Sequence, residues 1–204
     1  MLTPLVAVIL AVAVRFVIER RAGGPPGPPP PVISTLPEFV LTERSGTLVT
    51  RDELAGSPWV ADFIFTRCKV YCPRLTARMK ELAERLPEGA GVKLVSFTVD
   101  PDHDTPEVLS AYAERHGLSH RHEWLFLTGP RETIWSLVRH GFLLPVEEAP
   151  GNPDMPILHS NRFVLVDGEG RTRGAYDAFE ADALERLLAD LEALRAESAA
   201  AERP

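Results

Sequence analysis

The chain has 204 residues, the length of one ordinary domain with a modest additional segment. Apolar residues make up 45% and charged residues 25%, which is typical of a globular protein and too apolar for a disordered one. The net charge of −7 argues against general nucleic-acid binding, which requires a basic face. Two cysteines are too few for a multi-disulfide scaffold or a four-cysteine zinc site.

The amino-terminal segment is apolar except for Thr3 and Arg15 over residues 1–18, just short of the roughly 20 residues that a spanning helix needs. We predict that residues 1–21 form a membrane anchor that also acts as an uncleaved export signal. A cleaved signal peptide and an interfacial amphipathic helix are the alternatives. Residues 22–33 are rich in proline and glycine, which predicts an extended spacer between the anchor and the domain.

The segment 34–195 is predicted to be one α/β domain, because strand-like and helix-like patterns alternate along it. In chain order we expect a hairpin over 39–49, a buried strand over 59–65, a helix over 73–86, a strand over 92–99, a helix over 106–116, a strand over 124–127, a helix around 134–138, a hairpin over 162–176 and a closing helix around 184–194. An irregular stretch is expected over 144–156, and the tail 196–204 is expected to fray.

The two cysteines are four positions apart, Cys68 and Cys72, between the predicted buried strand and the following helix. This spacing places both sulfurs on one face of a helical turn. The positive end of the helix, together with Arg67, Lys69 and Arg74, favours the thiolate form that binds soft metals and attacks disulfides. A structural disulfide, ordinary core packing and coincidence are the alternative interpretations.

Six histidines could supply a further ligand, and five of them lie in polar or loop-like surroundings: His103, His116, His120, His122 and His140. The pair at positions 120 and 122 could bind a metal adventitiously. His159 differs because it lies between a proline-rich loop and a strongly apolar strand. A hydrogen-bonded structural histidine is the alternative at this position.

Four motifs resemble the Sco/SenC family in order and spacing. They are Phe65-Thr66-x-Cys68-x-x-x-Cys72-Pro73, Thr98-Val99-Asp100-Pro101-Asp102-x-Asp104-Thr105-Pro106, Trp124-x-Phe126-Leu127-Thr128-Gly129 and His159-Ser160-x-x-Phe163-x-Leu165-Val166-Asp167. The resemblance spans about residues 34–192 and implies a thioredoxin-like fold: a central mixed sheet flanked by helices, an amino-terminal hairpin and a loop insertion carrying a histidine. It also implies membrane tethering and copper delivery to cytochrome c oxidase.

The same resemblance implies that the copper ligands are Cys68, Cys72 and His159, with Asp100 in a supporting role. Two thiolates and one imidazole form a soft set of low coordination number, which suits Cu(I) better than zinc and can also hold Cu(II). Met155 is a possible additional soft contact, and an ordinary loop residue otherwise. The sequence departs from the commonest family pattern at Lys69, where many members carry proline.

The resemblance, together with these residues, implies a copper metallochaperone, and not an enzyme in the turnover sense, that serves a copper-accepting oxidase subunit or another copper carrier. The globular domain is expected on the extracytoplasmic side of a membrane, with no nucleic-acid partner. The alternative is a thiol–disulfide oxidoreductase that uses Cys68 and Cys72 as a redox dithiol to reduce the cysteines of a copper-site partner. A peroxiredoxin-like peroxidase is a third, weakly suggested by Thr66 and Arg67.

Overall fold

The computed structural model describes residues 27–69, 71–86, 90–118, 123–152 and 155–201. The predicted anchor 1–21, the first part of the predicted spacer, His120 and His122 lie outside the described residues. Within the described ranges, none of the helices combines the length and the apolar character needed to cross a membrane.

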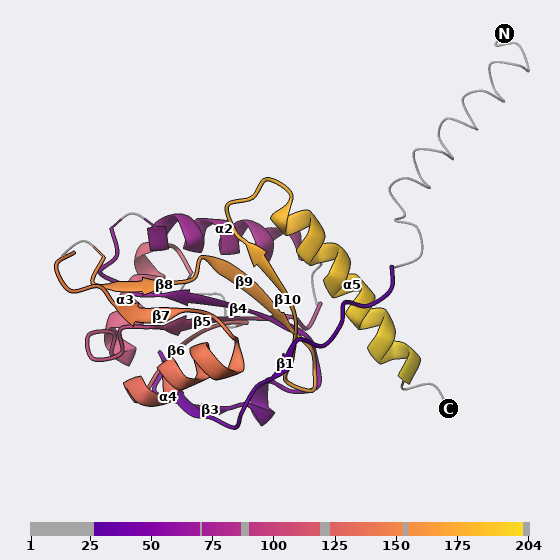
Figure 1. The fold of residues 1–204 in the computed structure, drawn as a ribbon, viewed down its shortest axis with the longest axis horizontal. Coiled ribbons are helices and arrows are strands. Elements are labelled where there is room, and N and C mark those ends of the chain that lie inside the picture. Colours follow the sequence, from indigo (N-terminus) through magenta and orange to yellow (C-terminus); the bar gives the residue numbers. More distant parts are fainter. Residues whose placement is uncertain (1–26, 70, 87–89, 119–122, 153–154, 202–204) are drawn as a thin grey trace, which may run out of the picture.

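The main sheet has eight strands and is mixed, as the sequence predicts (Figure 1). Three neighbouring strands, β4, β5 and β6, run parallel, and the pairings towards both edges are antiparallel. In spatial order the strands are β1 (Ser34–Thr35), β10 (Arg171–Asp177), β9 (Arg162–Val166), β4 (Trp59–Ile64), β5 (Lys93–Thr98), β6 (Trp124–Thr128), β2 (Val40–Glu43) and β3 (Leu48–Thr50).

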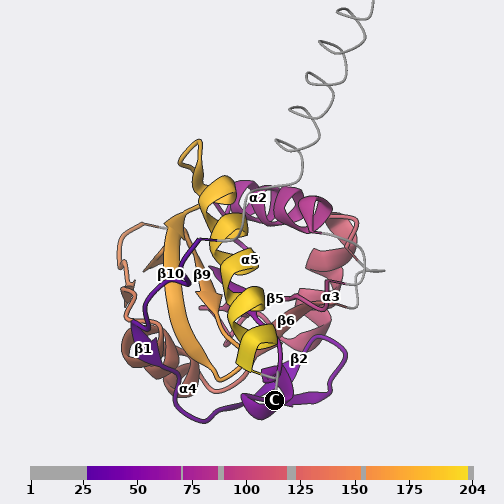
Figure 2. The ribbon, with the colours of Figure 1, turned by 90° about the vertical axis from the view of Figure 1, so that its right-hand side faces the viewer.

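Helices cover both faces of this sheet. Figure 1 shows α2 on one face and α4 on the other, and Figure 2 shows α5 lying across β10 and β9. The helical elements are the 3₁₀ turn η1 (Asp52–Leu54), α2 (Tyr71–Arg85), α3 (Pro106–Arg115), α4 (Arg131–Ser136), the π-helical turn η2 (Leu137–Gly141) and α5 (Ala183–Ala201). The predicted arrangement of a sheet flanked by helices is therefore confirmed.

The core lies on both faces of β4, all six residues of which are buried. Towards α4 it is aromatic: the Phe63 ring centroid lies 5.9 Å from that of Phe97 and 5.0 Å from that of Phe142. On the α2 face, the buried side chains Leu75 and Met79 pack at helical spacing. Both faces of a central parallel strand are covered in this way, which explains why residues 59–65 read as a nearly continuous apolar run.

Three features differ from the predictions. The helix expected to begin at Pro73 begins at Tyr71, so Cys72 lies in its first turn. Residues 196–201 continue α5 instead of fraying, because their alanine-rich sequence has high helix propensity. His159 is in a short strand, not in a loop: β7 (Val146–Glu148), which lies within the stretch expected to be irregular, pairs with β8 (Ile157–His159), which directly follows that stretch, in a second, two-stranded sheet.

The ends of the parallel strands position the site. The segment that follows β4 carries Cys68, and the segment that follows β5 carries Asp100. Because β4 and β5 are parallel neighbours, their carboxyl ends meet at one edge of the sheet, where α/β proteins commonly bind ligands. The β7–β8 hairpin lies at this same end of the molecule (Figure 1).

Candidate metal centre

The two cysteines are buried, are not disulfide-bonded and lie at the amino terminus of α2. The backbone amide of Cys68 donates to the carbonyl of Phe65 at 3.3 Å, which forms a tight turn directly after β4. The amide of Cys72 then donates to the Cys68 sulfur at 3.3 Å. The first turn of the helix therefore directs a backbone donor at one sulfur and places the other sulfur in the core.

The imidazole of His159 reaches this pair from the β7–β8 hairpin. Its Nε2 lies 3.6 Å from the Cys72 sulfur. Its Nδ1 lies 3.0 Å from the carbonyl oxygen of Ser160, which can only accept a hydrogen bond, so Nδ1 carries the proton and Nε2 keeps a free lone pair. The Phe65 ring packs edge-on against the imidazole with centroids 5.5 Å apart. The structure thus brings together a thiol and an imidazole 87 positions apart in the sequence.

The environment shifts the pKa values of the His159 imidazole and the Cys72 thiol in opposite directions, and in each case the neutral form is favoured. Burial lowers the pKa of His159, and the Ser160 carbonyl and the nearby Cys68 oppose that shift only in part. The hydrogen bond with the Cys68 sulfur, followed by burial, raises the pKa of Cys72 well above the ordinary thiol value. The expectation that the helix terminus and nearby cations make both cysteines thiolates is therefore wrong for Cys72, because the hydrogen bond with Cys68 and the burial of the side chain favour its neutral thiol.

A cavity of about 210 Å³ opens beside Cys68 and the His159 imidazole. Its lining is mainly apolar or aromatic and consists of Cys68, Tyr71, Leu75, Met155, His159, Asn161 and Phe179. The Met155 amide donates to the backbone and side-chain oxygens of Asn152, at 3.2 and 3.1 Å, which ties the Met155 backbone to Asn152. Met155 therefore lines the same cavity as two of the three predicted ligands.

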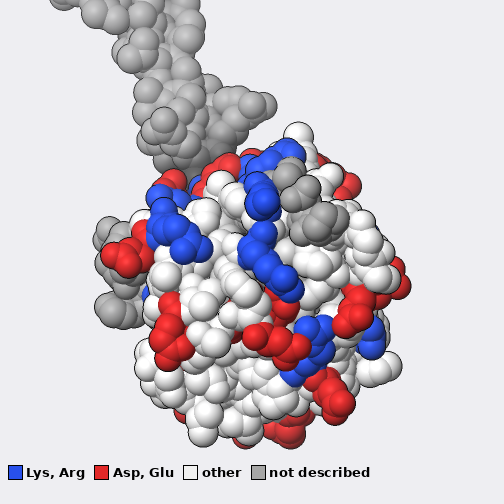
Figure 3. Space-filling model, turned by 90° about the vertical axis from the view of Figure 1, so that its left-hand side faces the viewer, with Lys and Arg blue, Asp and Glu red and all other residues white. Residues whose placement is uncertain are grey.

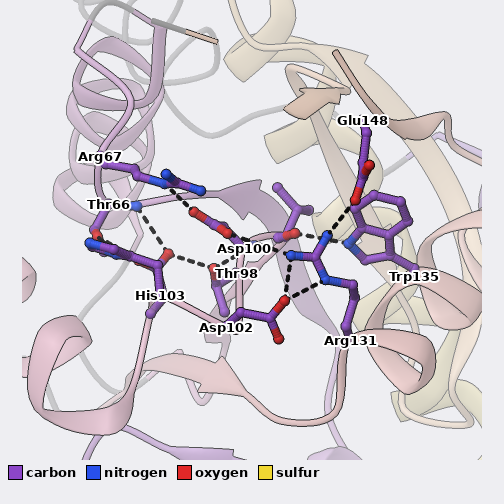
Figure 4. Close-up of polar contacts among 11 residues, drawn as sticks. Thr66, Arg67, Thr98, Asp100, Asp102, His103, Arg131, Trp135 and Glu148 are labelled. Carbon is purple, nitrogen blue, oxygen red and sulfur yellow. Dashed lines mark hydrogen bonds and ion pairs between the residues drawn. The ribbon is translucent and has the colours of Figure 1, made fainter. Parts of the chain in front are cut away.

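Asp100, the predicted supporting residue, is buried and lies beside the cysteine segment. Its Oδ2 accepts a hydrogen bond from Nε of Arg67 at 2.5 Å, and its own amide donates to the Thr98 hydroxyl at 3.0 Å (Figure 4). Arg67 immediately precedes Cys68, so this ion pair fastens the turn that carries the first sulfur. Asp100 therefore holds the turn that carries Cys68.

Asp104 anchors the same turn and was not assigned a role from the sequence. One carboxylate oxygen accepts from the Thr66 hydroxyl at 2.5 Å, and the other accepts from the Thr66 amide at 3.0 Å and the Thr98 hydroxyl at 2.6 Å. The ligand-type atoms of Asp100, His103 and Asp104 lie within 4.8 Å of one another. Because these carboxylates already accept hydrogen bonds from the protein, we assign no metal to that cluster.

Asp62 is a second residue that the sequence analysis missed. It lies on β4 with no exposed surface, and neither carboxylate oxygen has a hydrogen-bond partner in the described part of the chain. Burial raises its pKa to about 7, and the Ser96 hydroxyl on β5 offsets only part of that rise. Its charge also acts on Cys72, whose pKa it raises further. The signal available from the sequence was an aspartate within an otherwise apolar strand.

The outer surface at this end of the molecule carries interspersed charges. Figure 3 shows Lys and Arg side chains next to Asp and Glu side chains, on a face that is otherwise largely uncharged. Arg74, one of the cations expected near the sulfurs, lies over the Phe179 ring with its guanidinium 4.7 Å from the ring centroid. Among the described residues, the surface at this end of the molecule therefore has mixed charge.

A mixed sheet, helices on both faces and a dithiol at the start of a helix define a thioredoxin-like protein whose dithiol is joined by an imidazole. The family model described as SCO1/SenC matches residues 30–195. The SCO1 protein homolog of Bacillus subtilis (strain 168) is 32% identical over 155 residues, which cover 75% of this chain and 79% of that protein. The chain belongs to the SCO1/SenC family.

Solved structures share the fold of this chain. BsSco, described as a member of the Sco family of cytochrome c oxidase assembly proteins with a disulfide switch, has a TM-score of 0.73 at 29% identity, over 82% of this chain and 98% of that one. ScoI of Bradyrhizobium japonicum, solved with copper bound, has a TM-score of 0.66 at 24% identity, over 79% of this chain and 99% of that one. The thioredoxin-like fold predicted from the sequence is confirmed.

Proposed function

We propose that this protein is a copper metallochaperone that holds copper through Cys68, Cys72 and His159 and delivers it to a copper centre of a respiratory oxidase. The observation that carries the proposal is the 3.6 Å approach of His159 Nε2 to the Cys72 sulfur, from a hairpin far away in the sequence. Membership of a family whose members include BsSco, an oxidase assembly protein, and ScoI, solved with copper, supports the cargo and the recipient class.

The donor set suits copper for reasons of ligand softness and number. Two sulfurs and one unprotonated imidazole nitrogen satisfy Cu(I), whereas a structural zinc ion normally requires four ligands. The fixed proton on Nδ1 leaves Nε2 as the nitrogen that faces the sulfurs. When copper binds, the thiols lose their protons to solvent, so each sulfur changes from a hydrogen-bonding group to a ligand.

Asp100 is proposed to support the site by holding the cysteine turn. Its ion pair with Arg67 lies beside Cys68, and the buried carboxylate offers a short charge-assisted hydrogen bond. The arrangement keeps the turn fixed while the sulfurs exchange protons for metal.

The competing function, reduction of a partner's cysteines, receives less support from the geometry. Thiol–disulfide exchange requires an accessible thiolate, but Cys72 is buried and its pKa is raised. The pair also has three intervening residues, one more than the usual redox motif. We therefore place metal holding first and dithiol exchange second.

We further propose that residues 1–21 tether the domain to a membrane, with the globular part on the extracytoplasmic side. The support is the apolar run of residues 1–18 followed by a proline-rich spacer. An oxidising compartment makes the state of the cysteine pair important, because a Cys68–Cys72 disulfide cannot bind copper through thiolates.

The test is copper reconstitution of the reduced full chain in detergent. We expect one copper per chain, tight retention against a chelator, and a strong sulfur-to-copper absorption band when Cu(II) is used. Cys68→Ser, Cys72→Ser and His159→Ala should each abolish tight retention, while His116→Ala, which alters a histidine at the end of α3, should retain it. Full retention by His159→Ala, or no stoichiometric loading of the unmodified chain, would refute the proposal.

A further inference from the structure

We propose that Arg131, Trp135 and Arg139 form a clamp that sets the position of the β7–β8 hairpin, and therefore the distance between His159 and the cysteines. The inference deepens the proposed function and rests on it, because the imidazole matters only if it binds the cargo. These three side chains are positioning residues, and they act on the ligand through the hairpin backbone.

The hairpin needs such a support because it lies outside the main sheet. Within the described residues, β7 and β8 pair only with each other, and each has three residues. A two-stranded hairpin of this size is at best marginally stable by itself in water. The contacts that join it to the rest of the domain therefore decide where His159 lies.

Arg139 makes the contact nearest to the ligand. Its Nε and Nη2 both donate to the carbonyl of Val146, at 3.0 and 2.6 Å. Val146 is the residue of β7 that pairs directly with His159 in the hairpin register. A charged, bidentate donor on this carbonyl fixes the strand directly across from the imidazole.

Arg131 holds the other end of the same strand. Its Nη1 lies 3.2 Å from a carboxylate oxygen of Glu148, at the end of β7. Its Nε and Nη2 both donate to Oδ2 of Asp102, at 2.9 and 2.6 Å, in the segment after β5 (Figure 4). One guanidinium thus links the hairpin to the segment that carries Asp100.

Trp135 joins the two arginines to each other and to the sheet. The guanidinium carbons of Arg131 and Arg139 lie 5.1 and 5.0 Å from the centroid of its ring, within the range of cation–π attraction. Its indole Nε1 donates to the carbonyl of Val99 at 2.8 Å (Figure 4). The indole is therefore fixed at the end of β5, and both arginines pack against a fixed ring.

The clamp connects the two halves of the metal centre. Val99 precedes Asp100, and Asp100 binds Arg67 beside Cys68. On the other side, Arg139 holds Val146, and Val146 pairs with His159. A continuous set of contacts therefore runs from the cysteine turn to the imidazole around the edge of the site. This arrangement fixes their separation before any metal is present.

The experiment compares Arg139→Met with Arg139→Lys and with Arg51→Met, in the full chain in detergent. The methionine keeps an apolar side chain of similar length against Trp135 but has no donor, and the lysine restores one donor. Arg51 is the matched control, because its Nη1 also donates to a backbone carbonyl, that of Leu36 at 3.0 Å, outside the hairpin.

Two measurements separate positioning from general stabilisation. Hydrogen exchange of the metal-free protein reports the hairpin, and we expect Arg139→Met to raise exchange over residues 144–160 about tenfold, with β4 and β5 unchanged. Competition with a Cu(I) chelator measures the copper affinity of the site, and we expect this affinity to fall about tenfold in Arg139→Met. Arg139→Lys should recover part of both effects, and Arg51→Met should show neither.

Two outcomes with Arg139→Met overturn the inference. Unchanged hairpin exchange in Arg139→Met would show that the arginine does not hold the hairpin, whatever happens to copper. Increased exchange with unchanged copper retention would show that the hairpin's position does not set the site. If the unmodified chain binds no copper, the proposed function fails, and the exchange measurement still shows separately whether the clamp holds the hairpin.

Discussion

Replacing Asp62 with asparagine should stabilise the protein increasingly as the pH rises. The carboxyl group is fully buried on β4, neither oxygen has a hydrogen-bond partner among the described residues, and burial raises its pKa from 3.8 to about 7. Because the folded state binds this proton more tightly than the unfolded state does, ionisation of Asp62 opposes folding. Asparagine of nearly the same shape removes the ionisation.

The magnitude follows from the pKa difference. Below pH 3.8 the carboxyl is protonated in both states and contributes no pH dependence. Between that value and about pH 7, the free energy of unfolding falls by about 1.4 kcal/mol per pH unit, and above pH 7 the full penalty of about 4 kcal/mol applies. From pH 5 to pH 8, the advantage of Asp62→Asn over the unmodified protein should therefore grow by about 2–3 kcal/mol.

Urea unfolding of both proteins at several pH values between 5 and 8 measures this difference. The useful quantity is how the difference in free energy of unfolding between the two proteins changes with pH. Burying an amide and burying a neutral carboxylic acid cost similar, pH-independent amounts of free energy, so these costs do not affect that change. Asp52→Asn, which removes a carboxylate whose side chain is 79% exposed, controls for the loss of one surface charge. A stability difference between Asp62→Asn and the unmodified protein that stays constant across this pH range would refute the reasoning.

Three further changes test other parts of the structure. Met155→Leu keeps the apolar lining of the cavity but removes the thioether, so Cu(I) affinity measured by chelator competition should fall about fivefold; an unchanged affinity would make Met155 a packing residue. Asp104→Asn leaves donors in the cysteine turn without an acceptor and should lower the free energy of unfolding by about 2 kcal/mol in urea titration. Arg173→Met should lower the free energy of unfolding by about 3 kcal/mol in the same assay, since buried Arg173 binds Asp167 and Glu197 at 2.8 and 2.9 Å; equal stability of this variant and the unmodified protein would show that neither ion pair stabilises the fold.

Local patterns were sufficient to predict most of the fold. The apolar run of residues 59–65 could only be a buried strand, and the turn signals around Gly46 and Gly170 lie where the chain adopts positive φ angles of 86° and 75°. Thr105 followed by Pro106 marked the start of α3, where the threonine side chain accepts from the amide of Val108. These features depend on neighbouring residues, so a single sequence contains them.

The parts that local patterns did not predict depend on contacts between distant segments. The hairpin strands β7 and β8 have three residues each and are separated by a loop rich in proline and glycine, so no periodicity distinguishes them from coil. The shift of the Cys72 pKa was predicted in the wrong direction. The helix terminus and the basic neighbours can be identified in the sequence, but the depth at which the side chain is buried cannot. Arg131 and Arg139 look like surface residues until the hairpin is placed beside them.

The protonated state of Cys72 has a consequence for loading, because copper must displace a proton that the site holds tightly. The hydrogen bond with Cys68 and burial raise the Cys72 pKa, whereas burial lowers the pKa of His159 and favours the neutral imidazole. Apparent Cu(I) affinity should therefore rise at least about tenfold per pH unit between pH 6 and 8, since at least one proton leaves with each copper bound. Chelator competition, corrected for the chelator's own protonation, measures the slope. Cys72→Ser should reduce that slope by one proton, and a pH-independent affinity in the unmodified chain would show that Cys72 is a thiolate before copper arrives.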